Sequence, residues 1–188
     1  MPSKKQPQFT TQRLHLRPFV LADARDVQRL AGEWSIADTT LNIPYPYDEG
    51  VAEEWIASHA RHFDDGTLAT FAVVETESEQ LVGTVGLSIN PKHAVGELGY
   101  WIGLPFWGRG YTTEAVRALV NYGFTELCLN RIQGRHLVRN PASGRVMQKI
   151  GMSYEGTFRQ SIRKWDVYED LAMYSILVEE WGEEKTGT

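Results

Sequence analysis

The chain has 188 residues, of which 42% are hydrophobic and 23% are charged, and this size and apolar content suit one globular domain over 1–188 with a core at about 10–180. The formal net charge of −5 argues against general binding of nucleic acid, which requires a basic face. The single cysteine, Cys128, cannot form an intramolecular disulfide and reads as a small core residue, and no apolar run approaches the length of a membrane span, so we expect a cytoplasmic protein.

The first predicted elements are a strand and two helices. Leu14 and Leu16 alternate with polar side chains, which predicts a half-buried strand that ends at Pro18. A helix is predicted near 22–31. The apolar residues of the second predicted helix recur on one face, and Asp48 is its expected N-cap. These apolar-face residues are Val51, Trp55, Ile56, His59 and Phe63.

Three strands and a glycine loop come next. The segments 68–75 and 81–89 are rich in apolar and β-branched residues and are separated by a short polar run, which predicts a hairpin. A third strand is predicted at 96–103. It leads through Gly108 and Gly110 into a helix with an apolar stripe.

The last part of the chain returns to alternating strands and helices. A strand is predicted at 131–138, and the helix after it has Asn140 as its N-cap and Gly151 as the left-handed residue beyond its end. Two more strands are predicted at about 154–161 and 168–177. This order of elements predicts an α/β fold.

The glycine loop has the features of an anion site. Gly108 and Gly110 carry no side chain that would block a ligand, so the loop can turn backbone N–H groups toward a phosphate at the positive end of the following helix. Such a loop suits a diphosphate. The spacing Gly108-x-Gly110-x-x-Thr113 lacks the third glycine of a dinucleotide-binding fingerprint, which disfavours that alternative.

The loop also carries a family resemblance. It reads Trp107-Gly108-Arg109-Gly110-Tyr111-Thr112, and the strand before it contains Gly99-Tyr100-Trp101. These residues resemble the acyl-CoA-binding loop of the GCN5-related N-acetyltransferase superfamily, in its ribosomal-protein N-terminal acetyltransferase branch. The usual superfamily pattern is Gln/Arg-x-x-Gly-x-Gly/Ala, and the chain departs from it at Trp107 and Thr112. Further matches are Asn140-Pro141-Ala142-Ser143, Ile150-Gly151-Met152, Tyr154-Glu155-Gly156 and Tyr168-Glu169-Asp170, so the resemblance covers nearly the whole chain.

The resemblance implies a fold and a donor. The fold is a mixed, mostly antiparallel twisted sheet flanked by helices and splayed between its fourth and fifth strands, with the pantetheine arm of acetyl-CoA in the gap. Backbone groups that the splay leaves unpaired would bind this arm. The implied contacts with acetyl-CoA are Tyr100, Trp101, Ile102, Gly108, Arg109, Gly110, Tyr111, Thr112, Thr113, Asn140 and Ser143. No metal is expected.

Two side chains are candidates for proton transfer. Glu97 precedes Gly99, a glycine whose place inside a strand is typical of a bulge, and is a candidate base acting directly or through water; the alternative is a solvated glutamate that holds a loop. The tyrosine that many family members place on the helix after the fifth strand corresponds to Met147, which cannot donate a proton. Ser143, one turn earlier, is the implied donor to the cofactor sulfur, and the alternative is that it only supports the start of its helix.

The implied activity is direct transfer of an acetyl group from acetyl-CoA to a primary amine, with the α-amine of a protein or peptide as the favoured acceptor. An α-amine has a pKa near ~8 and needs only a weak base, whereas a lysine side chain is near ~10.4. A small-molecule amine, such as a polyamine, an amino acid or an antibiotic, and a non-catalytic CoA-sensing module are the alternatives. Candidates for the acceptor groove are Trp34, Tyr45, Tyr168 and Asp170. No nucleic-acid or membrane partner is expected, and the resemblance leaves a homodimer open.

Overall fold

The computed structural model describes residues 5–182, which are organised by one eight-stranded sheet in the order β1-β2-β3-β4-β5-β6-β8-β7. The strands are β1 (Phe9–Thr10), β2 (Leu14–Arg17), β3 (Leu68–Glu75), β4 (Leu81–Asn90), β5 (Val95–Ile102), β6 (Arg131–Leu137), β7 (Ser153–Lys164) and β8 (Val167–Leu177). Neighbouring strands are antiparallel except for β5 and β6, which are parallel. The expected mixed α/β sheet is confirmed.

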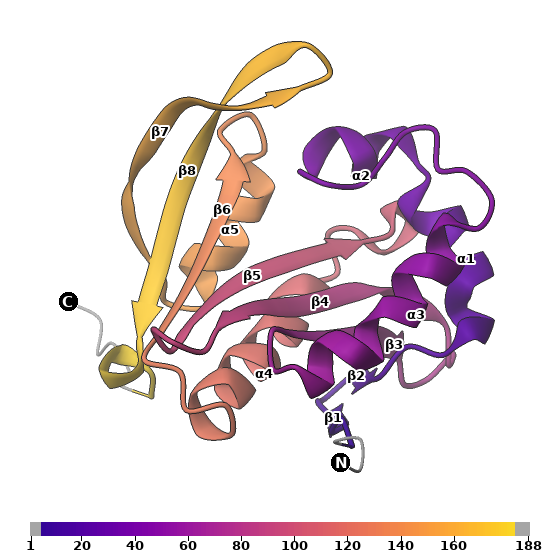
Figure 1. Cartoon of the computed structure of the whole chain (residues 1–188), viewed down its shortest axis with the longest axis horizontal. Coiled ribbons are helices and arrows are strands. Elements are labelled where there is room, and N and C mark those ends of the chain that lie inside the picture. Colours follow the sequence, from indigo (N-terminus) through magenta and orange to yellow (C-terminus); the bar gives the residue numbers. More distant parts are fainter. Residues whose placement is uncertain (1–4, 183–188) are drawn as a thin grey trace.

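Helices cover both faces of this sheet. They are α1 (Ala24–Ala31), α2 (Trp34–Thr39), α3 (Val51–Asp64), α4 (Tyr111–Thr125) and α5 (Pro141–Lys149), with short 3-10 helices at Leu21–Asp23, Leu104–Phe106 and Val178–Glu180. Figure 1 shows α1 and α3 in front of the sheet, where they pack on β4 and β3, and α4 behind it, against β4 and β5. The apolar stripe of α4 is fully buried at Ala115, Val116, Leu119 and Val120, so burial of this stripe fixes the helix against the sheet.

The two parallel strands part after a short paired segment. Val95–Leu98 of β5 pairs with Arg131–Gly134 of β6, and no residue of β5 beyond Leu98 pairs with β6 in the described chain. Figure 1 shows the two strands diverging toward the end that bears α2. The predicted splay between these strands is therefore present, and it leaves one edge of 99–102 without a strand partner.

The structure corrects three local expectations. The N-cap of α3 is Gly50, with a left-handed φ of 88°, and not Asp48. Cys128 is exposed in the loop between α4 and β6, with a φ of 52°, and is not a core residue. The short helix α2, which begins at Trp34, lies in a segment where the sequence pattern predicted no helix.

Other expectations at element ends are confirmed. The side chain of Asn140 accepts a hydrogen bond from the N–H of Ser143 and caps α5, and Gly151 follows the end of this helix with a φ of 93°. Among residues 5–182, no helix is both long enough and apolar enough to cross a membrane.

Candidate active site

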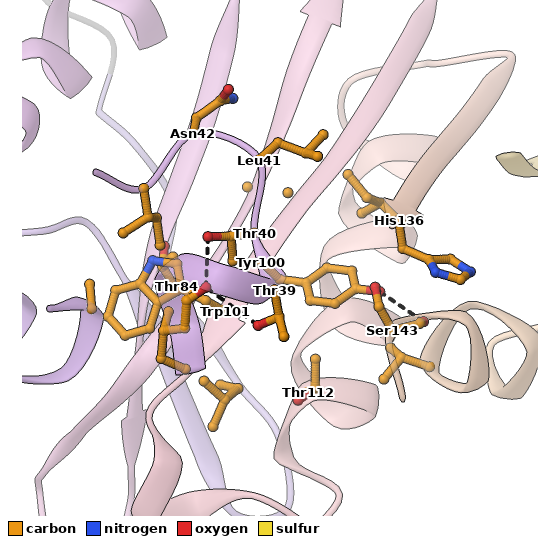
Figure 2. A pocket seen from close by; sticks show the side chains of 18 of the residues that line it. Thr39, Thr40, Leu41, Asn42, Thr84, Tyr100, Trp101, Thr112, His136 and Ser143 are labelled. Atoms are coloured by element: carbon orange, nitrogen blue, oxygen red, sulfur yellow. Dashed lines mark hydrogen bonds between the residues drawn. The ribbon is translucent and has the colours of Figure 1, made fainter. Parts of the chain in front are cut away.

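A cavity of about 880 Å³ occupies the place where β5 and β6 part. Its walls come from both faces of the sheet. Figure 2 shows Tyr100 extending toward Ser143 on one side of this cavity, with Thr84 and Trp101 on the other and 39–42 along its rim. The gap between the strands is thus continuous with the space on both sides.

The alternation of side chains along β5 divides the cavity into two halves. Glu97, Gly99 and Trp101 share one face of β5, and Ser88, Gly86 and Thr84 lie opposite them on β4. Tyr100 points to the other face, where its hydroxyl meets α5. We call the first the acceptor half and the second the cofactor half. A ligand bound in one half therefore meets a ligand bound in the other only at the parted edge of β5.

The glycine loop forms the far end of the cofactor half. Gly108 has a φ of 75° and Gly110, the residue before α4, has a φ of 80°, a conformation that side chains rarely adopt. A β-carbon built on Gly108 would meet no atom within 4 Å, and one built on Gly110 would meet only Arg13, at 3.5 Å. Within residues 5–182, the N–H groups of 108–113 donate to no oxygen. The loop therefore presents open, unpaired donors at the positive end of a helix, which fits a diphosphate.

The side chains around this loop take different directions. Thr112 and Thr113 line the cavity together with Gly108 and Gly110. The side chain of Tyr111 is buried, and its hydroxyl donates to the carboxylate of Glu75. Arg109 lies over the ring of Phe106, with 5.5 Å between the guanidinium carbon and the ring centre, and is absent from the lining among the described residues. Arg109 and Tyr111 can therefore contribute to this site only through their backbone in the present arrangement.

The edge of β5 offers backbone groups inside the cavity. Tyr100, Trp101 and Ile102, the three residues that the resemblance assigns to the pantetheine arm, all line it. The carbonyl of Ile102 has a partner within the chain, since it accepts a hydrogen bond of 2.5 Å from the indole N–H of Trp107. The backbone of Trp101 faces β4, where it pairs with Thr84, so Tyr100 has its backbone groups on the open edge. Gly99 is open, since a β-carbon there would meet nothing within 4 Å.

Tyr100 and Ser143 form a pair of hydroxyl groups in the cofactor half. The Tyr100 hydroxyl lies 2.8 Å from Ser143 Oγ and also donates to the Ser143 carbonyl at 3.1 Å. Burial raises the pKa of Tyr100 to about 12, with the hydrogen bond from Ser143 acting in the opposite direction. The phenol therefore keeps its proton at neutral pH and can donate it. Met147 is fully buried with its methyl group near Gly134, and within the described residues it is not part of the cavity lining.

Glu97 lines the acceptor half but does not stand alone. Its Oε1 lies 2.8 Å from Nε of Arg135, and its Oε2 accepts a hydrogen bond of 3.1 Å from the amide of Gln133. Both partners belong to β6, next to the paired part of β5. These two contacts occupy lone pairs on both oxygens, so direct removal of an amine proton would compete with them.

A second set of contacts connects α2 to the opposite side of the cavity. Arg139 forms ion pairs with Asp38 at 2.8 Å and with Glu169 of β8 at 2.7 Å. The amide of Asn140 donates to the Thr39 carbonyl at 3.2 Å. The rim at 39–42 is thereby fixed across the splay, and Asn140, expected to contact the cofactor, lines the cavity and also holds this rim.

The four residues predicted for the acceptor groove lie outside the cavity lining. Trp34 and Tyr45 pack against each other with 4.9 Å between ring centres, and Trp34 stacks on Trp165 at 4.3 Å. Tyr168 is 63% exposed, and Asp170 accepts a hydrogen bond from the backbone N–H of Gln160. The structure instead places Tyr47 in the lining, from the same aromatic loop as Tyr45.

Sequence reasoning did not find several lining residues. Thr70 and Thr84 are buried hydroxyl residues of β3 and β4 in the acceptor half. Buried threonine inside an otherwise apolar strand was the available signal. His136 is also buried in the lining, with Nδ1 2.8 Å from the Leu137 carbonyl and Nε2 without a hydrogen-bond partner among the described residues. Within that same part of the chain, no three His, Cys, Asp or Glu side chains gather in a way that could hold a metal ion.

Comparison with known proteins adds a family and three relatives. Residues 13–153 match the family model for the acetyltransferase (GNAT) domain. The uncharacterized N-acetyltransferase p20 of Bacillus licheniformis is 32% identical over 174 residues, which span 91% of this chain and 96% of that protein. The putative ribosomal N-acetyltransferase YdaF of Bacillus subtilis is 30% identical over 178 residues, 88% of this chain and 93% of the relative. A crystal structure of a GNAT-family acetyltransferase from Bacillus anthracis superposes with a TM-score of 0.83 at 26% identity, covering 93% of this chain and all of that one.

Proposed function

Because this chain belongs to the GNAT acetyltransferase family and is thus an acetyl-CoA-dependent N-acetyltransferase, we propose that its acceptor is the α-amine of a protein or peptide. The observation that supports this acceptor is the pairing of Glu97 with Arg135 and Gln133. Both oxygens of this carboxylate are already engaged, so it can take up a proton only by giving up one of these contacts. An α-amine with a pKa near ~8 is about one-tenth neutral at pH 7 and tolerates a weak base, whereas a lysine amine near ~10.4 does not.

The residues around the glycine loop fit the diphosphate of acetyl-CoA. Open positions at Gly108 and Gly110 and unpaired N–H groups at 108–113 form the cradle, and Thr112 and Thr113 add hydroxyl donors. Arg145 and Lys149 of α5 also line the cavity. When bound, acetyl-CoA supplies the acetyl group as a thioester that a neutral amine attacks without a covalent enzyme intermediate.

The free edge of β5 has two tasks in this proposal. Backbone groups of Tyr100, which face the open edge, hold the amide-containing arm, and an N–H near Leu98 to Tyr100 faces the thioester oxygen, on which negative charge develops. One preorganised donor of this kind contributes about 3 kcal/mol to catalysis. Gly99 leaves room for this approach, since it carries no side chain.

Proton transfer is assigned to groups on the two sides of the edge. Glu97, in the acceptor half, accepts the amine proton through a water molecule, since both of its oxygens are already engaged. The paired hydroxyls of Tyr100 and Ser143, in the cofactor half, hold a proton for the departing thiolate, which leaves as the thiol of CoA. In this proposal these hydroxyls take the role of the tyrosine that many family members have at the position of Met147, which argues against a non-catalytic CoA-sensing module.

We also infer that 1–188 act as one catalytic domain. The single sheet running from β1 to β8 through both sides of the cavity supports this inference for the described residues. A homodimer remains a prediction, which analytical ultracentrifugation tests.

Two matched peptides test the acceptor. One has a free N-terminus and no lysine, and the other has an acetylated N-terminus and one lysine in the same sequence. We expect release of CoA with the first peptide at pH 7.5 and at least about 10-fold slower release with the second. Equal or faster reaction of the lysine peptide would reject the α-amine proposal and leave the acetyltransferase activity intact.

A further inference from the structure

The acceptor half of the cavity has an apolar wall with neutral hydroxyl groups. Val27 of α1, Trp55 of α3 and Trp101 of β5 are apolar side chains in this lining. The polar groups on the neighbouring strands are the hydroxyls of Thr70, Thr84 and Ser88, all on the face of the sheet that bears Glu97. Thr84 already donates to the Phe71 carbonyl at 2.9 Å. This surface can therefore solvate a neutral group and offers little to a charged one.

The charged residues around the cavity also disfavour an acceptor with a second positive charge. In the described part of the chain, the charged residues that line it are Glu97, Arg135, Arg145 and Lys149. Glu97 is the one carboxylate among them, and Arg135 neutralises it at 2.8 Å. A second cationic group on an acceptor would enter this space without a free carboxylate to pair with. Burying a charge without a partner is unfavourable.

We infer that the acceptor half selects an α-amine whose first residue has an apolar or hydroxyl side chain and that it rejects polycationic amines. This inference rests on the proposed function and narrows its acceptor class. Selectivity comes mainly from weak binding of polycationic amines, because their second positive charge would lose its hydration without gaining a compensating contact. A small or apolar first residue loses little hydration and gains contact with Trp55 and Trp101.

A designed change of charge provides the sharpest variant. Ser88 is exposed, lines the cavity and lies opposite Glu97 on β4, so Ser88→Asp adds a second carboxylate to the acceptor half and leaves two carboxylates there for one arginine, Arg135. Asn90 is exposed on the same strand two residues further on and is absent from the cavity lining. Asn90→Asp therefore carries the same change in charge outside the cavity and serves as the matched control.

The test measures kcat/KM by CoA release for spermidine and for lysine-free peptides that differ only at their first residue, with Ala, Ser, Leu, Asp or Lys at that position. Lysine is absent from all other positions. We expect the Ala, Ser and Leu peptides to react at least about 10-fold faster than the Lys peptide and spermidine. Ser88→Asp should narrow the gap between spermidine and the Ala peptide by about 10-fold, and Asn90→Asp should leave it unchanged.

The possible failures are distinguishable. Peptides that all react alike, or a preference for the Lys peptide, would overturn the selection by charge and leave the α-amine proposal standing. Faster reaction of spermidine than of every peptide would overturn both the selection and the α-amine acceptor. No release of CoA with any amine, despite saturable binding of acetyl-CoA in calorimetry, would count against the catalytic proposal and the inference that rests on it.

Discussion

The hydroxyl of Tyr100 lies 2.8 Å from Oγ of Ser143, and this contact joins β5 to α5 across the space where the two parallel strands part. Both residues line the cavity. The contact gives each hydroxyl a partner, so either can pass a proton while remaining hydrogen-bonded to the other. It also fixes the phenol at the side of the parted edge that faces α5.

Replacing Tyr100 by Phe removes one hydroxyl and keeps the ring. We expect kcat to fall by about 10- to 100-fold, in the range of a lost general acid, while the KM for acetyl-CoA stays within about 2-fold. Steady-state kinetics with a fixed peptide acceptor measures both constants. An unchanged kcat, or a loss confined to KM, would remove the phenol from proton transfer.

Ser143→Ala tests whether the two hydroxyls act as one unit. If they do, each single substitution lowers kcat by nearly the full amount, and Tyr100→Phe combined with Ser143→Ala lowers kcat little further. Losses that multiply in the double variant would show independent roles. The backbone N–H of Ser143 donates to the Asn140 side chain that caps α5. Circular dichroism of Ser143→Ala should therefore confirm that the helix content is unchanged.

Gly110→Val should abolish binding of acetyl-CoA. The new side chain would have to adopt a φ near 80° and would stand over the unpaired N–H groups of the loop. Gly66→Val is the matched control, because Gly66 has a similar φ of 69°, has no atom within 4 Å of an added β-carbon and lies outside this cavity. Both variants should lose stability, and calorimetry should show normal binding of acetyl-CoA only for the Gly66 variant. Normal binding of acetyl-CoA by both variants would show that the diphosphate binds somewhere other than this loop.

Glu97→Gln separates a proton acceptor from a structural ion pair. At pH 7 an α-amine with a pKa near ~8 is mostly protonated, so we expect kcat/KM for the peptide to fall by about 10-fold. At pH 9 the amine is already neutral, and the difference from the parent enzyme should shrink to less than about 2-fold. A loss of the same size at both pH values would assign Glu97 to holding Arg135 and Gln133. Arg135→Gln, which keeps the carboxylate, is the companion variant.

Local chemistry explains which parts of this structure could be predicted from sequence. Gly108 and Gly110 mark the loop because their backbone conformation is unfavourable for other residues, and Asn140 marks the start of α5 because its side chain binds an N–H three residues away. Each of these signals involves residues that are at most three positions apart in the sequence. The N-cap of α3 shows the limit of such rules, since Gly50 took the place expected for Asp48.

The missed features depend on contacts between distant segments. The six residues of α2 are too few to form a stable helix alone, and its end is held by Arg139 and Asn140, 101 positions further along the chain. The pairing of Glu97 with Arg135 requires the register of two parallel strands. No pattern within β5 could show that the Tyr100 hydroxyl would reach α5.

The contacts of Arg139 predict an effect on the acceptor. Arg139→Ala breaks the ion pairs with Asp38 and Glu169 and releases the cavity rim at 39–42. We expect the KM for the peptide to rise by about 3- to 10-fold with little change in kcat, since in our proposal the rim positions the peptide and takes no part in proton transfer. Arg163→Ala removes the exposed ion pair with Asp166 at the tip of the β7–β8 hairpin and should change neither constant. A fall in kcat alone would contradict the assignment of Arg139 to the rim.

His59 makes the stability of the fold depend on pH. It is buried on α3 between Phe19 and Trp55, and neither ring nitrogen has a hydrogen-bond partner among the described residues. Burial, with a smaller contribution from the nearby His62, lowers the pKa of His59 to about 4. The unfolded chain has the ordinary value of 6.5 and therefore binds a proton first as the pH falls.

The free energy of unfolding should consequently be unaffected by His59 above pH 6.5 and should fall progressively between pH 6.5 and pH 4. The pKa difference corresponds to a loss of roughly 3 kcal/mol at the lower limit. Urea unfolding of the parent protein and of His59→Leu measures this contribution, because the variant should lose that part of the pH dependence and keep its stability near pH 7.5. His62→Gln, at an exposed position of the same helix, should retain nearly the parent slope. If His59→Leu and the parent lose stability in parallel below pH 6.5, the buried imidazole does not stay neutral in the folded protein.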